Sequence, residues 1–532
     1  MAYYKDLREY LKALEDNGKL VHIKGEINKD TQLYPLIRLQ YRGLPEEERR
    51  AFLFENVIDS KGRKYDIPVV VGALASSSQM YAIGMKCKAE EISERLAQAE
   101  MNLIAPKLVD NGPVQEVVRL GDNLLEHGGL GEFPIPIATP GFDPSPYITA
   151  PYWVTKDPDT GIPNVGMYRA MVKSPTRTGL NFGVPTRHGF IHFRRCKERG
   201  IPLQAAIVIG GPPNLGYVAV SPLPTDINEF AVAGAIAGEP VELVKCKTVD
   251  LEVPANAEIV IEGEVPTNEL EPEAPFGEAY GFVGLEDMNP FFNIKCITHR
   301  RKPIWMATLS QYPPSESSKI RQFAQEGTIF RHLRHDLKMS HVLQVGFLDT
   351  TGSNKLMAIK VDKTTPAEVM RTLEAAAQRM PVTKIIVAVD KDVNIHDLDS
   401  LTLAILKRSQ PHRDYRIDTL PAPSLADYSI EPEDKLEKRL PTDPDRPMAS
   451  RLLINATMQW PYPPLSLPKE EFMEEALRLW QREGLPKLTL KEPWWGISLG
   501  FWSKEHEEYA QAVVKGDYYR AGDAYSKRRA PG

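Results

Sequence analysis

The chain has 532 residues, of which 42% are hydrophobic and 26% are charged, and its formal net charge is −6. This length accommodates two or three domains, and the composition is that of an ordinary soluble globular protein. The mildly acidic balance, without a basic stripe, predicts no nucleic-acid partner.

The four cysteines are Cys87, Cys196, Cys246 and Cys296. They form no CxxC pair, which argues against zinc ribbons, iron–sulfur clusters and a disulfide framework. The sequence has no apolar run long enough for a membrane span, and its first residues, MAYYKDLREYL, do not resemble a signal peptide. We therefore expect a cytoplasmic protein with no membrane partner.

An amphipathic helix is predicted at the start of the chain, because apolar side chains recur at i, i+3, i+4 and i+7. Those side chains are Leu7, Tyr10, Leu11 and Leu14. Gly18 follows where a left-handed residue ends a helix. The strand-like segments LVHI, FLFENV and IPVVVGAL come next, and a helix is predicted over residues 88–101. Residues 1–130 are thus predicted to form an N-terminal α/β domain.

Prolines crowd residues 133–151, which predicts a semi-rigid connection with a domain boundary near its start. Beyond it, the segments YWVTK and NVGMYRAMV flank the turn-forming DPDTGIP and predict a hairpin. Short β-rich segments continue to about Leu309. We therefore predict a split β-barrel-like domain over residues 131–312.

The pattern then changes to alternating helices and strands. A long helix is predicted over residues 316–337, the segment TPAE at 365–368 has a capping-box pattern, and KIIVAVD precedes another helix from His396. These features predict a C-terminal α/β domain over residues 313–465. The overall fold class is therefore α/β (α+β).

The end of the chain, residues 466–532, is predicted to be a helical tail. Its helices, near 469–482 and 505–514, flank the aromatic segment EPWWGISLGFW. So many exposed tryptophans would favour aggregation, so we expect the tail to pack on another domain or subunit. A charged loop over residues 431–447 is predicted to be solvated.

The acidic segment ELEPEAPFGEAYG, residues 269–281, carries four carboxylates. Pro272 and Pro275 each remove a backbone donor and fix φ, which predicts a stiff loop rather than a helix or a central strand. Such a loop presents Glu273 and Glu278 together. Neighbouring carboxylates in a partly dry site favour general acid/base chemistry, because one of them tends to keep its proton.

Arg169 lies in NVGMYRAMV, where it is predicted to share one face of a strand with Val165 and Met167. A carboxylate can bind its guanidinium group through two parallel hydrogen bonds, and the residues alone favour a structural ion pair over a catalytic one. Asn164 opens the same strand with the opposite parity. Either Gly166 hosts a bulge or Asn164 precedes the strand.

His188 and His192 are spaced i, i+4 on a helix that Thr186 is predicted to cap, a spacing that can place two imidazoles on one metal. No HExxH motif is present, so a zinc protease is excluded. A single hard-metal ligand and a helix-surface histidine remain the alternatives for His188. Glu229 follows Asp226 at a capping-box spacing, although a carboxylate there could equally bind a cation.

Ser450 and Arg451 precede LLINAT and offer a hydroxyl and a guanidinium to a phosphate. The sequence contains no GxxxxGK[ST], no strand–GxGxxG–helix and no GxSxG motif. A P-loop, a Rossmann site and a hydrolase nucleophile elbow therefore lack support.

Together, several of these segments resemble the UbiD-type family of decarboxylases, which use prenylated FMN. The resemblance runs from the first helix to about Trp460. Its segments are DLREYLKALEDNGKLVHI, FLFENV, PYITAPYWVTKDPDTGIPNVGMYRAMV, VKCKTVDLEVPANAEIVIEGEV, EAPFGEAYG and MASRLLINAT.

The resemblance implies a function for residues that are far apart in the sequence. The implied catalytic triad is Arg169, Glu273 and Glu278. The implied ligands of Mn²⁺ (or Mg²⁺ or Fe²⁺), with K⁺ nearby, are Asn164, His188 and Glu229. The other implied contacts of the cofactor are Met167, Tyr168, Arg187, Ser221 and Arg451, of which Arg451 would contact the phosphate. The central domain would then be the flavin-binding domain.

The implied activity is reversible, non-oxidative decarboxylation of an aromatic or α,β-unsaturated carboxylic acid. Loss of CO2 from an sp² carbon needs an electron sink that side chains lack, and prenylated FMN would supply it. The substrate carboxylate would lie near Arg169, and Glu278 would protonate the carbon while Arg169 keeps Glu273 charged.

Two alternatives within the family are decarboxylation of an aryl-CoA thioester, such as phthaloyl-CoA, and aromatic carboxylation. An alternative of another class is a non-catalytic metal-binding assembly protein. The implied partners are a flavin prenyltransferase that supplies the cofactor and further copies of this chain, in a dimer or a hexamer.

Overall fold

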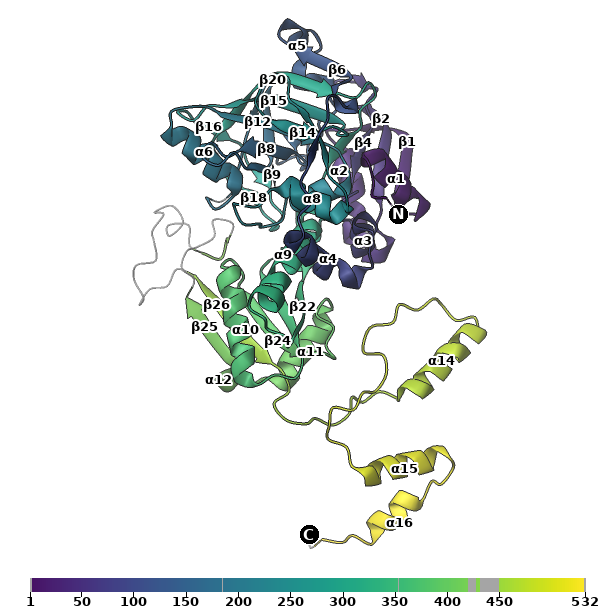
Figure 1. The fold of residues 1–532 in the computed structure, drawn as a ribbon. Helices are drawn as coiled ribbons and strands as arrows, with labels where there is room; N and C mark the ends of the chain where they lie inside the picture. Colours follow the sequence, from purple (N-terminus) through teal and green to yellow (C-terminus); the bar gives the residue numbers. More distant parts are fainter. Residues whose placement is uncertain (1, 184, 353, 420–426, 431–448, 531–532) are drawn as a thin grey trace.

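The structure is a computed structural model that describes residues 2–183, 185–352, 354–419, 427–430 and 449–530. The charged loop predicted over residues 431–447 lies outside the described residues. Figure 1 shows an N-terminal unit beside a central sheet, the helix α9 leading to a C-terminal sheet, and a tail that extends away from the body. The predicted α/β fold class is confirmed.

The first helix is α1 (Leu7–Asp16), which buries the four predicted apolar side chains. Asp6 caps it by accepting hydrogen bonds from the N–H groups of Arg8 and Glu9, and Gly18 has a φ of +67°. This helix prediction is confirmed because every signal for it is local.

The N-terminal sheet has the order β1–β2–β4–β21, with β3 paired to β2. Its strands are β1 (Leu20–Asn28), β2 (Ala51–Ile58), β3 (Lys64–Tyr65), β4 (Val69–Val71) and β21 (Trp305–Ala307). The helices of this unit are α2 (Leu33–Gly43), α3 (Ser78–Met85) and α4 (Ile92–Met101). The pairing of β21 with β4 ties a late segment of the chain into the first sheet.

The central sheet has nine strands in the order β7–β10–β11–β20–β15–β12–β8–β9, with β6 paired to β20. Its strands are β6 (Val117–Leu120), β7 (Tyr147–Ile148), β8 (Tyr152–Lys156), β9 (Pro163–Met167), β10 (Ala170–Ser174), β11 (Arg177–Gly179), β12 (Leu203–Ile209), β15 (Ile259–Val265) and β20 (Phe291–His299). β8 and β9 form the predicted hairpin.

A smaller sheet of β5 (Lys107–Leu108), β13 (Glu242–Lys245) and β14 (Glu252–Pro254) lies beside it. Strands β5 and β6 lie before residue 130 and pair with strands beyond it, so these pairings cross the predicted boundary between the first two domains. The domain bounds themselves stay a prediction.

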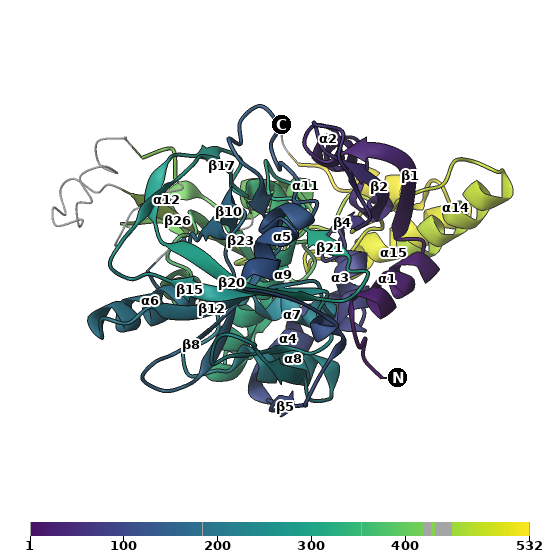
Figure 2. The same ribbon diagram turned by 90° about the horizontal axis from the view of Figure 1, so that it is seen from above.

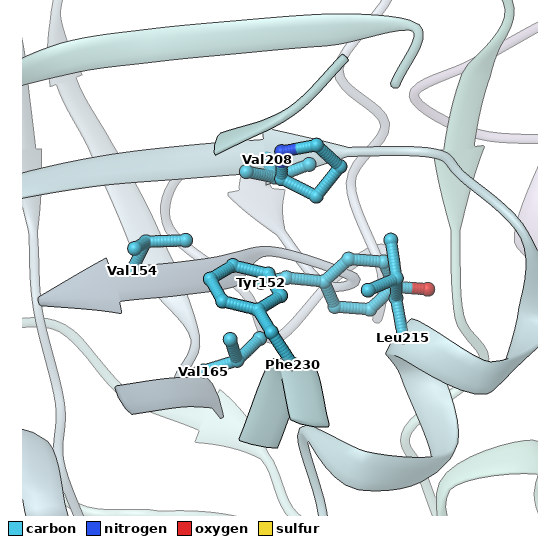
Figure 3. A pocket seen from close by; sticks show the side chains of 7 residues that line it. Tyr152, Val154, Val165, Val208, Leu215 and Phe230 are labelled. Carbon is cyan, nitrogen blue, oxygen red and sulfur yellow. The ribbon is translucent and has the colours of Figure 1, made fainter. Parts of the chain in front are cut away.

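One face of β8 and β9 is packed with apolar side chains. Figure 3 shows Val154 and Val165 gathered with Phe230 and Leu215, and the crevice between these side chains has no room for a water molecule. The helices that cover this face are α7 (Pro213–Val218) and α8 (Glu229–Ala237). Because neighbouring residues of a strand point to opposite faces, Asn164 is directed away from this core.

The helix α6 (His188–Glu198) packs on β8, β9 and β12. Both ribbon views place it at the end of the central sheet remote from the N-terminal unit (Figures 1 and 2). The helix α5 (Asp122–Glu126) packs on β6.

The helix α9 (Glu316–Arg331) connects the central sheet to the C-terminal domain, as predicted. The sheet of this domain has the order β22–β23–β24–β26–β25. Its strands are β22 (Val342–Phe347), β23 (Leu356–Val361), β24 (Ile385–Asp390), β25 (Tyr415–Thr419) and β26 (Ser450–Ala456). Its helices are α10 (Pro366–Arg379), α11 (Leu398–Arg408) and α12 (Pro411–Asp414). The predicted capping box of Thr365 and Glu368 is confirmed.

The tail holds α14 (Glu470–Arg482), α15 (Lys504–Val514) and α16 (Arg520–Ser526), and it extends away from the body in Figure 1. None of the residues of α14 is buried. The tail contacts the C-terminal domain through the ion pair of Lys491 with Asp399, at 3.1 Å. The predicted helices are present, whereas packing of the tail on another subunit stays a prediction.

Candidate active site

The acidic segment folds as a stepped hairpin. β16 (Glu271–Glu273) pairs with β19 (Asp287–Asn289), and β17 (Phe276–Gly277) pairs with β18 (Val283–Gly284). The hairpin's tip is closed by a hydrogen bond from the N–H of Glu278 to the carbonyl of Phe282, at 2.9 Å. The segment is therefore more regular than the predicted stiff loop. The prolines lie in or beside two-stranded ladders, where a missing N–H is tolerated.

This hairpin brings two glutamates to one arginine. The Nε and Nη2 atoms of Arg169 donate to the two carboxylate oxygens of Glu273, at 3.3 and 3.2 Å, and Nη1 donates to Glu278. The guanidinium also lies over the ring of Phe276, 5.3 Å from its centroid. The structure thus brings together all three residues of the predicted triad.

The two carboxylates have different surroundings. The side chain of Glu273 is fully buried and also accepts hydrogen bonds from the amides of Asn181 and Asn289, at 2.8 and 3.3 Å. The side chain of Glu278 is 28% exposed, and Arg169 is its hydrogen-bond partner in the described residues. Glu273 is therefore held in place, whereas Glu278 can reach a bound molecule.

The charge of Arg169 is secured by this arrangement. Burial lowers the pKa of Arg169, but the carboxylates of Glu278 and Glu273 outweigh that effect and keep the pKa above its ordinary value. Tyr147 supports the hairpin by donating to the carbonyl of Ala274, at 2.8 Å. The site therefore carries a permanent positive charge against a fixed negative one.

The predicted continuous strand through Arg169 is wrong. β9 ends at Met167 and β10 begins at Ala170, because the chain turns out of the sheet at Tyr168. The carbonyl of Tyr168 accepts a hydrogen bond from the indole of Trp153, at 2.7 Å. The parity conflict between Asn164 and Arg169 is thereby resolved without a bulge, since the two residues do not share a strand.

Gly166 allows this turn. A Cβ atom at Gly166 would lie 2.3 Å from the ring of Tyr168, so no other residue leaves room for that ring. Tyr168 then packs edge-on against Phe182, and its hydroxyl accepts a hydrogen bond from the N–H of Gly189, at 3.2 Å. The start of α6 is thus fixed next to the residue that precedes Arg169.

A second polar cluster lies where α6 and α8 begin. The Nδ1 atom of His188 lies 3.0 Å from Glu229 Oε1, and Glu229 Oε2 accepts from the N–H of Val165, at 3.3 Å. The amide of Asn164, next to Val165, donates to Thr155, at 3.3 Å. Burial raises the pKa of Glu229, and the contact with His188 opposes that rise. The three predicted metal ligands are therefore neighbours.

Two predictions about these helix ends are wrong. Arg187, rather than Thr186, is the N-cap residue of α6, and it makes no capping hydrogen bond. Asn228, rather than Asp226, caps α8, because its side chain accepts from the N–H of Phe230. Glu229 therefore points to His188 instead of completing a capping box.

His192 has a separate environment from His188. It is buried, its Nδ1 atom lies 2.9 Å from the hydroxyl of Thr155, and burial lowers its pKa to about 4. In the described part of the chain, no group of three His, Cys, Asp or Glu residues could hold a metal. A cation at the second cluster would thus depend on the amide oxygen of Asn164 in addition to His188 and Glu229.

Of the other predicted cofactor residues, some lie next to the two clusters and one does not contact them. Met167 and Tyr168 lie at the turn described above, and Ser221 donates to the carbonyl of Tyr217, at 2.9 Å. Arg451 lies on β26, where its Nη1 atom donates to the carbonyl of Ala377, at 2.5 Å. None of the contacts of Arg451 in the described residues reaches the two clusters.

Two further arginines are Arg187, which precedes His188 in the sequence, and Arg321. Burial, and to a smaller extent the charge of Arg321, lower the pKa of Arg187. Neither arginine has a hydrogen bond or an ion pair in the described ranges. Two partly buried guanidinium groups without a carboxylate fit an anionic ligand such as a phosphate.

Sequence reasoning missed Asn181, Asn289 and Arg321. Amide side chains carry no charge pattern, and Arg321 lies in a helix whose sequence gives no sign of its interaction with Arg187. Glu271, another carboxylate of the acidic segment, forms ion pairs with Lys173 and Arg177, at 2.8 and 2.7 Å.

Comparisons with known proteins match this architecture. Family models of 3-octaprenyl-4-hydroxybenzoate carboxy-lyase (UbiD) match residues 11–100 as its N-terminal domain, 107–313 as its Rift-related domain and 319–456 as its C-terminal domain. An uncharacterized protein of Archaeoglobus fulgidus is 32% identical over 483 residues, which cover 86% of this chain and 92% of that protein.

No helix in the described residues is long and apolar enough to cross a membrane.

Two solved structures are similar to this chain in three dimensions. An evolved dimeric form of the UbiD-class enzyme HmfF from Pelotomaculum thermopropionicum, in complex with prenylated FMN (prFMN), is 29% identical, with a TM-score of 0.76, covering 89% of this chain and 100% of that one. Vanillic acid decarboxylase of Sedimentibacter hydroxybenzoicus, in a closed form, is 25% identical, with a TM-score of 0.74, covering 91% of this chain and 100% of that one. The predicted family is confirmed: the chain belongs to the UbiD family of carboxy-lyases.

Proposed function

We propose that this enzyme uses prenylated FMN to decarboxylate an aromatic or α,β-unsaturated carboxylic acid reversibly and without oxidation. The observation that carries the proposal is the Arg169–Glu273–Glu278 cluster in a chain of this family. One carboxylate is fixed by three side chains, and the other, which Arg169 binds, is partly exposed toward a substrate. That asymmetry suits one proton donor beside one permanent charge.

Each residue of the cluster has a distinct role in this proposal. Arg169 holds the substrate carboxylate and stays charged, since Glu273 is bound to it through both oxygens. Glu278 carries the proton that replaces CO2 on the substrate carbon. Prenylated FMN, when bound, supplies the electron sink that no side chain offers.

The second cluster and the unpaired arginines would hold the cofactor. Asn164, His188 and Glu229 would bind Mn²⁺, Mg²⁺ or Fe²⁺, with K⁺ nearby, and Arg187 would face the phosphate. The remaining contacts would come from Met167, Tyr168 and Ser221, and Arg451 would contact the phosphate, as the resemblance implies. This assignment fits the residues, because two arginines lack an anionic partner in the described ranges and the carboxylate of Glu229 is buried next to a histidine.

Glu229→Gln tests the metal site. We expect the affinity for Mn²⁺ and for the flavin to fall at least about tenfold, because the amide removes a negative charge from the metal's ligands. Metal analysis and flavin absorbance after dialysis measure both losses. Glu239→Gln, an exposed residue just after the same helix, is the matched control. Unchanged retention in Glu229→Gln would contradict the assignment.

The cofactor itself is tested by producing the protein with and without a flavin prenyltransferase. Absorbance and mass spectrometry should show a bound modified flavin only with the prenyltransferase. Release of CO2 should then be measured with free aromatic acids and with aryl-CoA thioesters, and uptake should be measured in bicarbonate. Turnover of thioesters alone, or net carboxylation, would favour the two alternatives within the family. If no modified flavin is bound, a metal-binding assembly protein becomes the better interpretation.

We also propose that the tail joins copies of this chain. The α14 helix buries none of its side chains, and Phe472 and Leu479 on it are 43% and 38% exposed. Exposed apolar faces of this kind favour a second protein surface. Deleting residues 466–532 should leave a folded body with a smaller oligomer, as measured by light scattering. An unchanged oligomer would contradict the proposal.

A further inference from the structure

A further carboxylate, which is buried, lies near the proposed acid pair. Asp143 is 8% exposed, and its Oδ2 atom accepts a hydrogen bond from the N–H of Thr139, at 2.7 Å. Its own N–H donates to the carbonyl of Thr139, at 3.0 Å, so the two residues close a short loop. The other oxygen, Oδ1, is buried and has no hydrogen-bond partner in the described residues.

The Asp143 loop lies directly against the strand that carries Glu278. A Cβ atom at Gly277 would lie 2.7 Å from the hydroxyl of Thr139, so β17 and this loop are in close contact. Gly277 immediately precedes Glu278. The loop that Asp143 closes therefore supports the backbone next to Glu278.

We propose that Asp143 is a positioning residue for Glu278: its carboxylate fixes the Thr139 loop against Gly277, and its ionisation sets how firmly the hairpin's tip is held. The inference rests on the proposed role of Glu278 as the proton donor. Asp143 touches neither the substrate nor the cofactor in this account, and it acts through Thr139 and Gly277.

Protonation of Asp143 should make its support of the hairpin's tip depend on pH. Burial raises the pKa of Asp143 to about 6, although the N–H groups of Thr139 and Gly277 and the charge of Arg169 all lower it. The other titratable groups that face it are Tyr147 and Tyr34, whose pKa values lie well above neutrality. Asp143 is therefore the group that changes charge here near pH 6.

A purely structural role does not explain the buried charge. Because the pKa of Asp143 is higher in the folded state than its ordinary value of 3.8, the proton is bound more tightly after folding. Its contribution to stability is complete below pH 3.8 and is lost as the pH rises through about 6. The charged form thus weakens the fold at neutral pH, which favours a functional reason for it.

The test compares the wild-type holoenzyme with Asp143→Asn, which keeps the shape and one oxygen but not the charge. We expect kcat at pH 8 to fall roughly tenfold, as misplacement of a catalytic group predicts. The wild-type rate should also decline on acidification through a step near pH 6 that the variant lacks. Asp110→Asn, on the exposed surface, is the control.

Hydrogen–deuterium exchange gives a readout that needs no activity. In the wild type, after correction for intrinsic exchange, protection of residues 276–284 should rise as the pH decreases through about 6, because the neutral carboxyl of Asp143 is the form that stabilises the fold, and in Asp143→Asn it should not change with pH. If the variant keeps the wild-type pH profile and exchange, the inference is wrong. If the exchange behaves as expected but no acid is decarboxylated, the proposed function has failed and the positioning role of Asp143 stands.

Discussion

Glu278→Gln should abolish decarboxylation while leaving the cofactor bound. The glutamine can still accept a hydrogen bond from Arg169, so the hairpin keeps its shape, but it has no acidic proton to give to the substrate carbon. General acid catalysis contributes about 10² to 10⁴ in rate, and we expect kcat to fall by at least about 10².

Exchange of hydrogen for deuterium on the substrate or product is the sharper measurement. It requires proton transfer at the same carbon, so Glu278→Gln should lose exchange together with turnover. The control is Glu286→Gln, because Glu286 is exposed and lies two residues after β18, the strand that pairs with β17. Retained exchange in Glu278→Gln would show that another group delivers the proton.

Arg169→Lys should lower kcat/KM by about two orders of magnitude, although the charge is conserved. A lysine ammonium cannot donate two parallel hydrogen bonds to Glu273 and a third to Glu278, so both carboxylates lose their fixed positions. The buried Glu273 would keep the amides of Asn181 and Asn289 but not its bidentate partner. Steady-state kinetics with the loaded enzyme measures the loss.

The matched control is Arg177→Lys, because Arg177 is 43% exposed and forms an ion pair with Glu271 of the same hairpin. Its loss should cost little, as exposed ion pairs contribute about 0 to 1 kcal/mol to stability. If Arg169→Lys were as active as Arg177→Lys, bidentate geometry would be unnecessary and the role proposed for Arg169 would be wrong.

Elements with local signals were predictable from the sequence. The helix α1 has its apolar spacing, its Asp6 cap and Gly18 within a few residues of one another, and α10 has its capping box and first-turn proline. The β8–β9 hairpin could also be predicted from the sequence, because the turn DPDTGIP specifies it. These predictions need no knowledge of the rest of the chain.

The parts that failed depend on distant contacts. The turn at Tyr168 exists because Trp153 and Gly166 make room for it and bind it, and a strand pattern conceals both causes. The cap of α8 moved to Asn228 because Glu229 is occupied by His188, a residue 41 positions earlier in the sequence. Asp143 lies in a proline-rich segment whose sequence gives no sign that the residue is buried near β17.

Because β21 belongs to the N-terminal sheet, this sheet can be completed only late in the synthesis of the chain. Val69–Val71 pair in parallel with Trp305–Ala307, so the first sheet lacks an edge strand until more than half of the chain has been made. Pairings this distant form slowly, and an unpaired edge strand invites association with other chains. On the ribosome, the earliest residues of this enzyme would therefore wait for the central sheet, and the two would complete folding as one unit.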